Sequence, residues 1–485
     1  LPSGSKTIEP RKLNTTQWGY VCPIESPDGG NVGIINHLSI SASVTFGISS
    51  DNILDACLDN GMIDIKNIIS ENLYEYSKVF LNGNLVGLHN DPVYFSKLMS
   101  LLKRNSFINV LTSISWDVIA NEIYIFTDEG RLYRPLLILS KNKTWTKSSE
   151  LPNNPIIMGN YENISNLNMM IHGFLFYNND YKLADELDIY NAKYYKEELD
   201  ILKIKYKDKD DLLNFLESKQ CLIEYVDVCE ANYRFIAKDP YSINKSDYTH
   251  CEIHQSLIHS PTSMHIPFPE NSPAVRSMYS AQQTRHAVGV YSSAYNTRFD
   301  TFSNILYYPQ RPIIGSRYRR YVGFDKLPYG INAIVAIACY SGYNQEDALI
   351  VNRTSMERGM FKSLYYRSYS GSESNENTQV FFSNPQYQEN VVKKDLENYG
   401  KLDKNGFIFE GSSVTDEDVI VGKCIIDGEK DEKKQNIVKV KGEKIKYGTY
   451  GIVDKVVVTK NREGLRNYNI RIKKIRNPEV GDKFA

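Results

Sequence analysis

Residues 331–351 constrain the possible folds of this chain more than any other segment. Their unbroken apolar run, residues 333–338, predicts a strand that is buried on both faces, because a half-buried strand would alternate polar and apolar residues. The chain then turns through residues 341–344 and presents two adjacent carboxylates, Glu346 and Asp347, before apolar residues resume. The segment therefore predicts a core strand that ends at two acidic side chains.

The two carboxylates need a partner if apolar core surrounds them, because an unpaired buried carboxylate is strongly destabilising or takes up a proton. A hard divalent cation is one candidate, since magnesium prefers oxygen ligands and usually takes only one or two protein carboxylates. Alternatively, Glu346 and Asp347 cap the following helix and face water. These residues alone leave both interpretations open.

The length and composition limit the class of protein. A chain of 485 residues exceeds what one hydrophobic core usually organises, so we expect about two to four compact units. The contents of 41% hydrophobic and 24% charged residues are typical of globular proteins, and no apolar run is long enough to cross a membrane, so we expect no membrane partner. A formal net charge of -1 gives no overall attraction to nucleic acid, so phosphate contacts must come from local basic patches.

The seven cysteines are scattered and form no C-x-x-C pair. Their odd number and wide spacing argue against a disulfide framework and against a cysteine zinc site, and fit a reducing intracellular setting. The chain begins at Leu1 without an initiator methionine, and we expect it to be a piece of a longer polypeptide.

Local patterns predict a multidomain α+β fold. Asn82-Gly83 between apolar runs predicts a tight hairpin over residues 79–86, because both residues tolerate positive φ. Asp91 and Pro92 then open a helix with apolar residues at helical spacing. The other predicted elements are a hairpin over residues 123–127 and 132–139, a helix over 211–219, and strands over 222–228, 451–459 and 468–475.

Polar residues outside these elements allow functional and structural interpretations. Glu25 and Asp28 lie in an irregular Gly- and Pro-containing loop, where turn and capping roles are the simpler interpretation. His250 and His254 have the spacing of a metal pair, but no further zinc ligands follow, which favours a structural role. A cationic, aromatic surface suited to phosphates and bases, or else a solvated face, is predicted from Arg276, Tyr279, Arg285, His286, Arg298, Arg311, Arg317, Arg319 and Arg320.

Several longer segments together resemble one protein family. They are RKLNTTQWGYVCPIESPDGG, DEGRLYRP, HCEIHQSLI, IPFPENSPAVRSMYSAQQTRHAVG, NILYYPQRP, GYNQEDALIVNRTSMERGMFKSLYYRSY, GIVDKVVVT and PEVGDKFA. Their order and content resemble the second-largest subunit of multisubunit DNA-directed RNA polymerases. The resemblance covers almost the whole chain, and is closer to eukaryotic RNA polymerase II and to polymerases of large DNA viruses than to the bacterial beta subunit.

The resemblance implies a β-rich hybrid-binding core with a wall domain and two small α/β external domains. The chain would be a central fragment of the subunit, or one polypeptide of a divided subunit. The implied layout is residues 1–45 for the end of the fork region, 46–140 and 141–245 for the two external domains, 246–365 for the hybrid-binding region, 366–475 for the wall, and 476–485 for the truncated start of a second hybrid-binding segment.

The resemblance also implies site residues. Glu346 and Asp347 would be the catalytic carboxylates beside the second magnesium ion, the one that arrives with the nucleoside triphosphate. Arg276 matches an arginine that reaches the triphosphate, Lys483 a lysine near the substrate, and Tyr279 a tyrosine near the RNA 3′ end. The ligands of the first metal belong to the largest subunit in this family, so Mg²⁺ would be shared with that subunit, and no zinc is expected in this fragment.

Three further positions are implied to bind nucleic acid. Asn31 matches a position that lines the path of the RNA, and Arg285 lies in the same motif as Arg276. His286 stands where most relatives have Gln, and an imidazole can still hydrogen-bond to a nucleic-acid backbone. We expect these contacts to read backbone and shape, because transcription must accept any template.

The family therefore implies a nucleotidyltransferase that transcribes DNA into RNA as a multisubunit complex, with the isolated chain inactive. Expected partners are the largest subunit, other polymerase subunits, the remaining parts of the second-largest subunit, template DNA, the RNA–DNA hybrid and nucleoside triphosphates. Expected locations are the nucleus if the chain is cellular, and the host cytoplasm, a viral factory or the virion if it is viral. The alternative is a non-catalytic nucleic-acid-binding scaffold that kept the fold.

Overall fold

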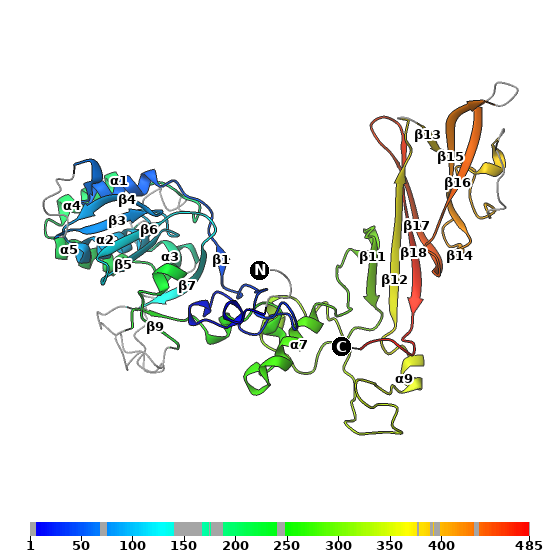
Figure 1. Ribbon diagram of the computed structural model, residues 1–485, viewed down its shortest axis with the longest axis horizontal. Coiled ribbons are helices and arrows are strands. Elements are labelled where there is room, and N and C mark those ends of the chain that lie inside the picture. Colours follow the sequence, from blue (N-terminus) through cyan, green and yellow to red (C-terminus); the bar gives the residue numbers. More distant parts are fainter. Residues whose placement is uncertain are drawn as a thin grey trace. The chain divides into compact units, whose positions relative to one another are not determined.

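The computed structural model describes residues 6–67, 75–139, 167–173, 175, 188–239, 248–375, 378–388, 391, 398–430 and 436–484. The chain divides into two compact units, Leu1–Gln282 and Gln283–Ala485 (Figure 1). Helices and several separate sheets confirm the predicted multidomain α+β class. All seven cysteines are free. None of the helices in the described ranges has the length and apolar character needed to cross a membrane.

One sheet of the first unit packs against helices around the larger core. Its strands run in the order β2 (Ile63–Asp64), β4 (Asn84–His89), β3 (Ser77–Leu81), β6 (Glu122–Phe126) and β5 (Ser113–Asp117). The helices are α1 (Asp51–Asp59), α2 (Pro92–Arg104), α4 (Lys196–Lys205) and α5 (Lys209–Lys219). The predicted hairpin is confirmed, with Asn82 and Gly83 at positive φ between β3 and β4. The helix opened by Asp91 is confirmed too, since its carboxylate accepts from the Tyr94 N–H at 3.0 Å.

A second sheet of this unit joins distant parts of the sequence. It contains β1 (Ser43–Val44), β7 (Leu132–Ile138), β8 (Ile223–Asp227), β9 (Ile236–Ala237) and β10 (His250–Cys251), with the short helices α3 (Leu167–His172) and α6 (Val228–Ala231) beside β8. The predicted helix over 211–219 and strand over 222–228 correspond to α5 and β8. Residues 141–166, 174, 176–187 and 240–245 of the predicted second external domain lie outside the described ranges.

The hairpin predicted from residues 123–127 and 132–139 is wrong, because β6 and β7 belong to different sheets. The turn between them pairs with a third segment instead. Thr45 N–H donates to the Arg131 carbonyl at 2.9 Å, and Gly130 N–H donates to the Thr45 carbonyl at 3.0 Å. β6 pairs with β3 on one edge and with β5 on the other, so neither edge is free for β7, which pairs with β1, β8 and β10 instead.

The second unit contains two antiparallel sheets. One has the order β11 (Phe302–Leu306), β12 (Ser363–Ser372), β18 (Arg466–Arg476), β17 (Tyr450–Lys460) and β14 (Ser413–Thr415), and the other has β13 (Gln379–Phe382), β15 (Val419–Lys430) and β16 (Asn436–Lys444). The predicted strands over 451–459 and 468–475 are confirmed as the paired β17 and β18. Edge-to-face contacts of Phe382 with Phe407 and Tyr468 lie in the core between the sheets.

The strand predicted for residues 333–338 is wrong. This segment is an exposed, irregular stretch in which Ile334 and Ile337 are fully exposed, and none of the described strands pairs with it. The turn that follows does form, because Asn344 Nδ2 donates to the Ala338 carbonyl at 2.7 Å and Asn344 Oδ1 accepts from the Tyr340 N–H at 3.0 Å. An apolar run indicates a need for burial, but the described residues of this chain supply neither a partner strand nor a cover.

Candidate functional site

The helix α7 (Ala274–Thr284) holds an arginine and a tyrosine against the N-terminal loop. The Arg276 guanidinium lies over the Tyr279 ring, with 5.4 Å between Cζ and the ring centroid, as expected for residues one helical turn apart. The Tyr279 hydroxyl donates to the Asp28 carboxylate at 2.8 Å, and Gln282 Nε2 donates to the Ser26 carbonyl at 3.2 Å. Figure 1 shows α7 beside this dark-blue loop. The loop and the helix therefore form one surface.

The Asp28 carboxylate changes the pKa of the Tyr279 hydroxyl. The hydrogen bond to the Asp28 carboxylate and the negative charge of that group raise the pKa of Tyr279. The phenol therefore stays protonated at neutral pH and keeps its role as a donor. Arg276 is exposed, and its guanidinium is accessible to an anionic ligand.

Hydrogen bonds from Arg11 fix the turn that carries Asn31. Arg11 Nη1 donates to the Gly30 and Val32 carbonyls at 2.7 and 3.0 Å. Gly33 has φ +73°, and a Cβ at this position would lie 2.2 Å from the Arg11 carbonyl oxygen, so glycine is required there. Asn31 is exposed at this turn, next to the loop residues that contact α7. The structure thus brings the predicted residues Asn31, Arg276 and Tyr279 to one region.

Sequence reasoning missed a polar cluster that fixes this loop. The Ser260 hydroxyl donates to the Glu25 carboxylate, which is 3% exposed, and Cys22 Sγ lies 3.2 Å from Ser263 Oγ. Burial alone would raise the pKa of Cys22, but hydrogen bonds from His259, Ser263 and backbone N–H groups lower it to about 6. No local pattern could reveal this cluster, because its two halves are distant in the sequence and meet only in the fold.

Glu346 and Asp347 lie at an exposed turn of the second unit. Glu346 has φ +56°, a conformation that costs a residue with a side chain about 1–3 kcal/mol. Neither carboxylate forms a hydrogen bond or ion pair with the described residues. The two carboxylates face water, as the second interpretation predicted, and apolar core does not surround them. The helix-capping part of that interpretation is wrong, because α9 (Arg353–Glu357) is capped by Asn352, whose side chain accepts from the Ser355 N–H at 3.0 Å.

Lys483 belongs to a terminal segment that is fixed to the second unit. Asp482 binds Arg476 Nη2 at 2.6 Å and accepts from the Glu479 N–H at 2.9 Å. The Phe484 ring lies 5.0 Å from the Phe361 ring, centroid to centroid, just before β12. The Lys483 side chain itself is exposed. This segment therefore has a defined path, although it contains neither a helix nor a strand.

Arg285 and His286 directly follow α7, and both are exposed. The backbone N–H of His286 donates to the Gln283 carbonyl at 3.0 Å and so continues the helical turn. These two residues belong to the second unit with Glu346, Asp347 and Lys483, whereas Asn31, Arg276 and Tyr279 belong to the first. The second unit thus contains the predicted carboxylates.

The carboxylate pair provides a limited set of metal ligands. Its hard oxygen donors suit magnesium, which accepts one or two protein carboxylates when substrate phosphates and water supply the rest. In the described part of the chain, no group of three or more His, Cys, Asp or Glu side chains could hold a metal ion.

His250 and His254 have separate structural roles, which confirms the structural interpretation of this pair. His250 Nε2 lies 2.8 Å from the Glu224 carboxylate in the core. His254 accepts from the Ser256 N–H at 3.1 Å and caps the short 3₁₀ helix Gln255–Ile258. The two rings bind different partners, so they do not form a metal site.

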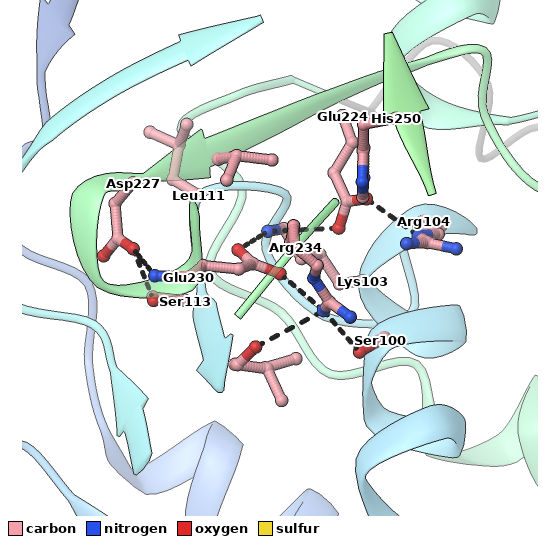
Figure 2. A network of polar contacts seen from close by, with 12 residues as sticks. Ser100, Lys103, Arg104, Leu111, Ser113, Glu224, Asp227, Glu230, Arg234 and His250 are labelled. Carbon is pink, nitrogen blue, oxygen red and sulfur yellow. Dashed lines mark hydrogen bonds and ion pairs between the residues drawn. The ribbon is translucent and has the colours of Figure 1, made fainter. Parts of the chain in front are cut away.

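Glu224 belongs to a buried ionic network that connects α2, β8 and α6 (Figure 2). Lys103 Nζ lies 2.6 Å from Glu230 and 3.4 Å from Glu224, Arg104 Nε lies 2.9 Å from Glu224, and Arg234 Nη2 lies 3.0 Å from Glu230. Burial raises the pKa of Glu230, whereas the nearby cations overcome burial and hold the pKa of Glu224 well below its usual range. This network connects elements that are far apart in the sequence.

Three family models match the chain. The model for RNA polymerase Rpb2, domain 3, matches residues 2–44, the model for domain 4 matches residues 79–140, and the model for domain 6 matches residues 262–485. Together they cover more than half of the chain.

Individual relatives match nearly the whole length of this chain. The chain is 34% identical over 490 residues to DNA-directed RNA polymerase II subunit RPB2 of Encephalitozoon cuniculi, covering 99% of this chain and 39% of that relative. It is 32% identical over 495 residues to DNA-directed RNA polymerase II subunit 2 of Arabidopsis thaliana, covering 99% and 38%. It is 30% identical over 513 residues to DNA-directed RNA polymerase subunit Rpo2 of Saccharolobus shibatae, covering 100% and 40%.

These matches define the class as subunits of multisubunit RNA polymerases. Within this class, the chain belongs to the family of second-largest subunits, as its motifs predicted. It spans about two fifths of the length of the relatives that it matches.

Proposed function

We propose that this chain is the central part of a second-largest RNA polymerase subunit and supplies nucleotide and RNA–DNA hybrid contacts to an active site that the largest subunit completes. The main support is the surface on which α7 presents Arg276 and Tyr279 beside the Asn31 turn. A long-range hydrogen bond fixes this arrangement, in a chain similar over nearly its whole length to DNA-directed RNA polymerase subunits. The domain layout implied by the resemblance remains a prediction.

The chemistry proposed for the two cations follows from the charge of the substrate. In nucleotidyl transfer the 3′ hydroxyl of RNA attacks the α-phosphate in line, and negative charge develops on the departing pyrophosphate. Arg276 would bind the triphosphate bidentately, and the Lys483 ammonium would stabilise charge near the reacting end. Tyr279, held as a hydrogen-bond donor by Asp28, would orient the RNA 3′ end.

Glu346 and Asp347 would bind the metal ion that enters with the nucleoside triphosphate. Mg²⁺ at this position would neutralise charge on the phosphate oxygens. The described residues offer two adjacent carboxylates for this purpose, so further ligands must come from the substrate and from the largest subunit. Glu346 has φ +56°, a backbone conformation that is unfavourable for a residue with a side chain, and this conformation would orient the pair. Such strained residues are common at functional sites.

Asn31, Arg285 and His286 would bind the RNA–DNA hybrid. All three are exposed, and their side chains offer amide, guanidinium and imidazole groups to phosphates and sugars. Such contacts recognise backbone geometry and accept any base sequence. The proposed partners are the largest subunit, the other polymerase subunits, the remaining parts of the second-largest subunit, and the nucleic acids. The proposed location is wherever that complex transcribes: the nucleus of a cell, or the host cytoplasm, viral factory or virion of a virus.

Elongation by the assembled complex tests these roles. In a polymerase assembled from all its subunits, Arg276→Ala and Asp347→Ala should each lower the rate of nucleotide addition about 10²-fold, the typical effect of removing one transition-state contact. Arg353→Ala is the matched control, since Arg353 is 91% exposed and its one ion pair with a described residue is with Glu357 on its own helix. Wild-type rates in both site variants would refute the role assignments.

The second candidate is a scaffold that binds nucleic acid without catalysis. It predicts an assembled complex that retains an RNA–DNA hybrid but adds no nucleotides, with the two site variants indistinguishable from the unmodified chain. The first proposal predicts nucleotide addition by the complex and none by the purified chain alone. RNA synthesis by the partner-free chain would contradict the view that its site is shared.

A further inference from the structure

None of the described strands pairs with one edge of β17 over its second half, and this stretch is called the free edge. On one side β17 pairs with β18 along its length, but on the other side the partner segment of Gly411 and Ser412 ends at Val453. A β-bulge follows between Val453 and Lys455. Beyond the bulge, the alternation of antiparallel hydrogen bonds points the N–H and C=O groups of alternate residues away from β18. These residues are Val456, Val458 and Lys460.

A side chain already occupies the position of a partner strand. The Val456 N–H donates to Glu410 Oε1 at 2.8 Å, where the carbonyl of an added strand would accept. Within the described ranges, Val458 and Lys460 have no backbone partner on this edge. Strand edges that remain open in this way can pair with an extended peptide.

A cavity of about 520 Å³ lies along this edge. Val456, Val458 and Lys460 line it together, because alternate residues of a strand share one face. Phe407 and Ile408 supply further apolar lining. The cavity can therefore take apolar side chains from every second residue of a peptide paired with the edge.

The charges at the cavity differ along the strand. Lys460 lines it where β17 ends and forms no ion pair with the described residues. Its neighbour across the hairpin, Arg466, is neutralised by Glu373, with 2.6 Å between Nη2 and Oε1. Glu410 and Asp403 are the acidic lining residues. A complementary peptide would place an acidic side chain near Lys460 and a basic side chain near Glu410.

We propose that an extended segment of a partner protein binds here as an additional β-strand along Val456–Lys460. Its alternate residues are apolar and enter the cavity, and an acidic residue lies at the Lys460 end. A helix could not satisfy the outward N–H and C=O groups of the edge, which selects an extended occupant. This inference rests on β17 and its neighbours and does not depend on the proposed polymerase chemistry.

The test uses the full chain and a fluorescein-labelled seven-residue probe, Arg-Thr-Val-Thr-Val-Thr-Glu, in which Arg, both Val residues and Glu share one face, followed by fluorescence anisotropy. The probe should bind saturably. N-methylation of its edge-facing amides should weaken binding about tenfold or more, because two hydrogen bonds of ordinary strength are lost. Val458→Asp should weaken binding at least as much, because it places a charge in the cavity. Replacing the terminal Glu of the probe by Lys should weaken binding to the unmodified chain and strengthen binding to Lys460→Glu.

Val457→Asp is the matched control. Val457 is 37% exposed and Val458 is 41% exposed, and the two neighbours point to opposite faces of the same strand. Val457→Asp should retain the binding of the unmodified chain and also shows that a charge on β17 is compatible with folding. Absence of saturable binding, equal losses in the two variants, or equal binding of the N-methylated probe would overturn the proposal. Self-association through this edge, seen by sedimentation and abolished by Val458→Asp, would overturn the choice of a partner protein in favour of a second copy.

Discussion

Replacement of Lys103 by Met tests whether the buried ionic network stabilises the first unit. The Lys103 side chain is 2% exposed and lies between Glu230 and Glu224, at 2.6 and 3.4 Å (Figure 2). Met has a similar length but no charge, so Lys103→Met leaves two buried carboxylates with fewer cations. Removing one partner of a buried ion pair typically costs about 3–5 kcal/mol, because the remaining charge stays desolvated.

Hydrogen–deuterium exchange of the full chain measures this cost locally. Backbone amides of α2 and β8 should exchange faster in Lys103→Met, with the free energy of opening lowered by about 3–5 kcal/mol. Lys78→Met is the matched control, because Lys78 is 50% exposed and its pair with Glu122 at 3.0 Å is worth less than about 1 kcal/mol. If both variants lose the same small amount, the network does not stabilise the unit as inferred.

Two further measurements separate charge from packing. Adding Glu230→Gln to Lys103→Met should recover part of the loss, since it removes one uncompensated carboxylate. The loss in Lys103→Met should also be smaller at pH 5 than at pH 7. Burial already raises the pKa of Glu230, and loss of the ammonium raises it further, so the carboxyl takes up a proton as the pH falls. If neither Glu230→Gln nor the lower pH reduces the loss of stability in Lys103→Met, that loss reflects altered packing alone.

Three other predictions follow from single groups. Burial lowers the pKa of His250 to about 4 from its ordinary 6.5, so the neutral ring stabilises the fold above pH 6.5 and this contribution is lost as the pH falls toward 4. In His250→Asn the free energy of unfolding should therefore fall less steeply between pH 6.5 and pH 4. The ultraviolet absorbance of the Cys22 thiolate, taken as the difference between the unmodified chain and Cys22→Ser, should reach half its maximum near pH 6, and Ser263→Ala should move that midpoint upward. Gly33→Ala should destabilise the N-terminal loop in thermal unfolding by more than Gly29→Ala, because both have positive φ but only Gly33 also meets backbone atoms within 4 Å.

Local signals predicted local structure well. Asn82 and Gly83 form the expected hairpin turn, and Asp91 caps the expected helix, because each depends on backbone preferences and hydrogen bonds a few residues apart. The pairing of β17 with β18 follows the same rule. The predicted hairpin of β6 and β7 failed, because β6 pairs with β3 and β5 on its two edges, and one of these partners is distant in the sequence.

The sequence by itself determined the family and the identity of the residues that bear charge at the proposed site. Motif order carried that information, together with the residue types that bind phosphate and magnesium. It also showed that residues 333–338 require burial, but it could not show whether this chain supplies their cover.

Only the tertiary structure decided which distant residues meet. Tyr279 contacts Asp28 and thereby brings Arg276 to the Asn31 turn, although nothing in either segment specifies the other. The same is true of the free edge of β17, which exists because its partner segment ends at Val453. Hydrogen bonds across the fold depend on the final position of each backbone, which local propensity does not determine.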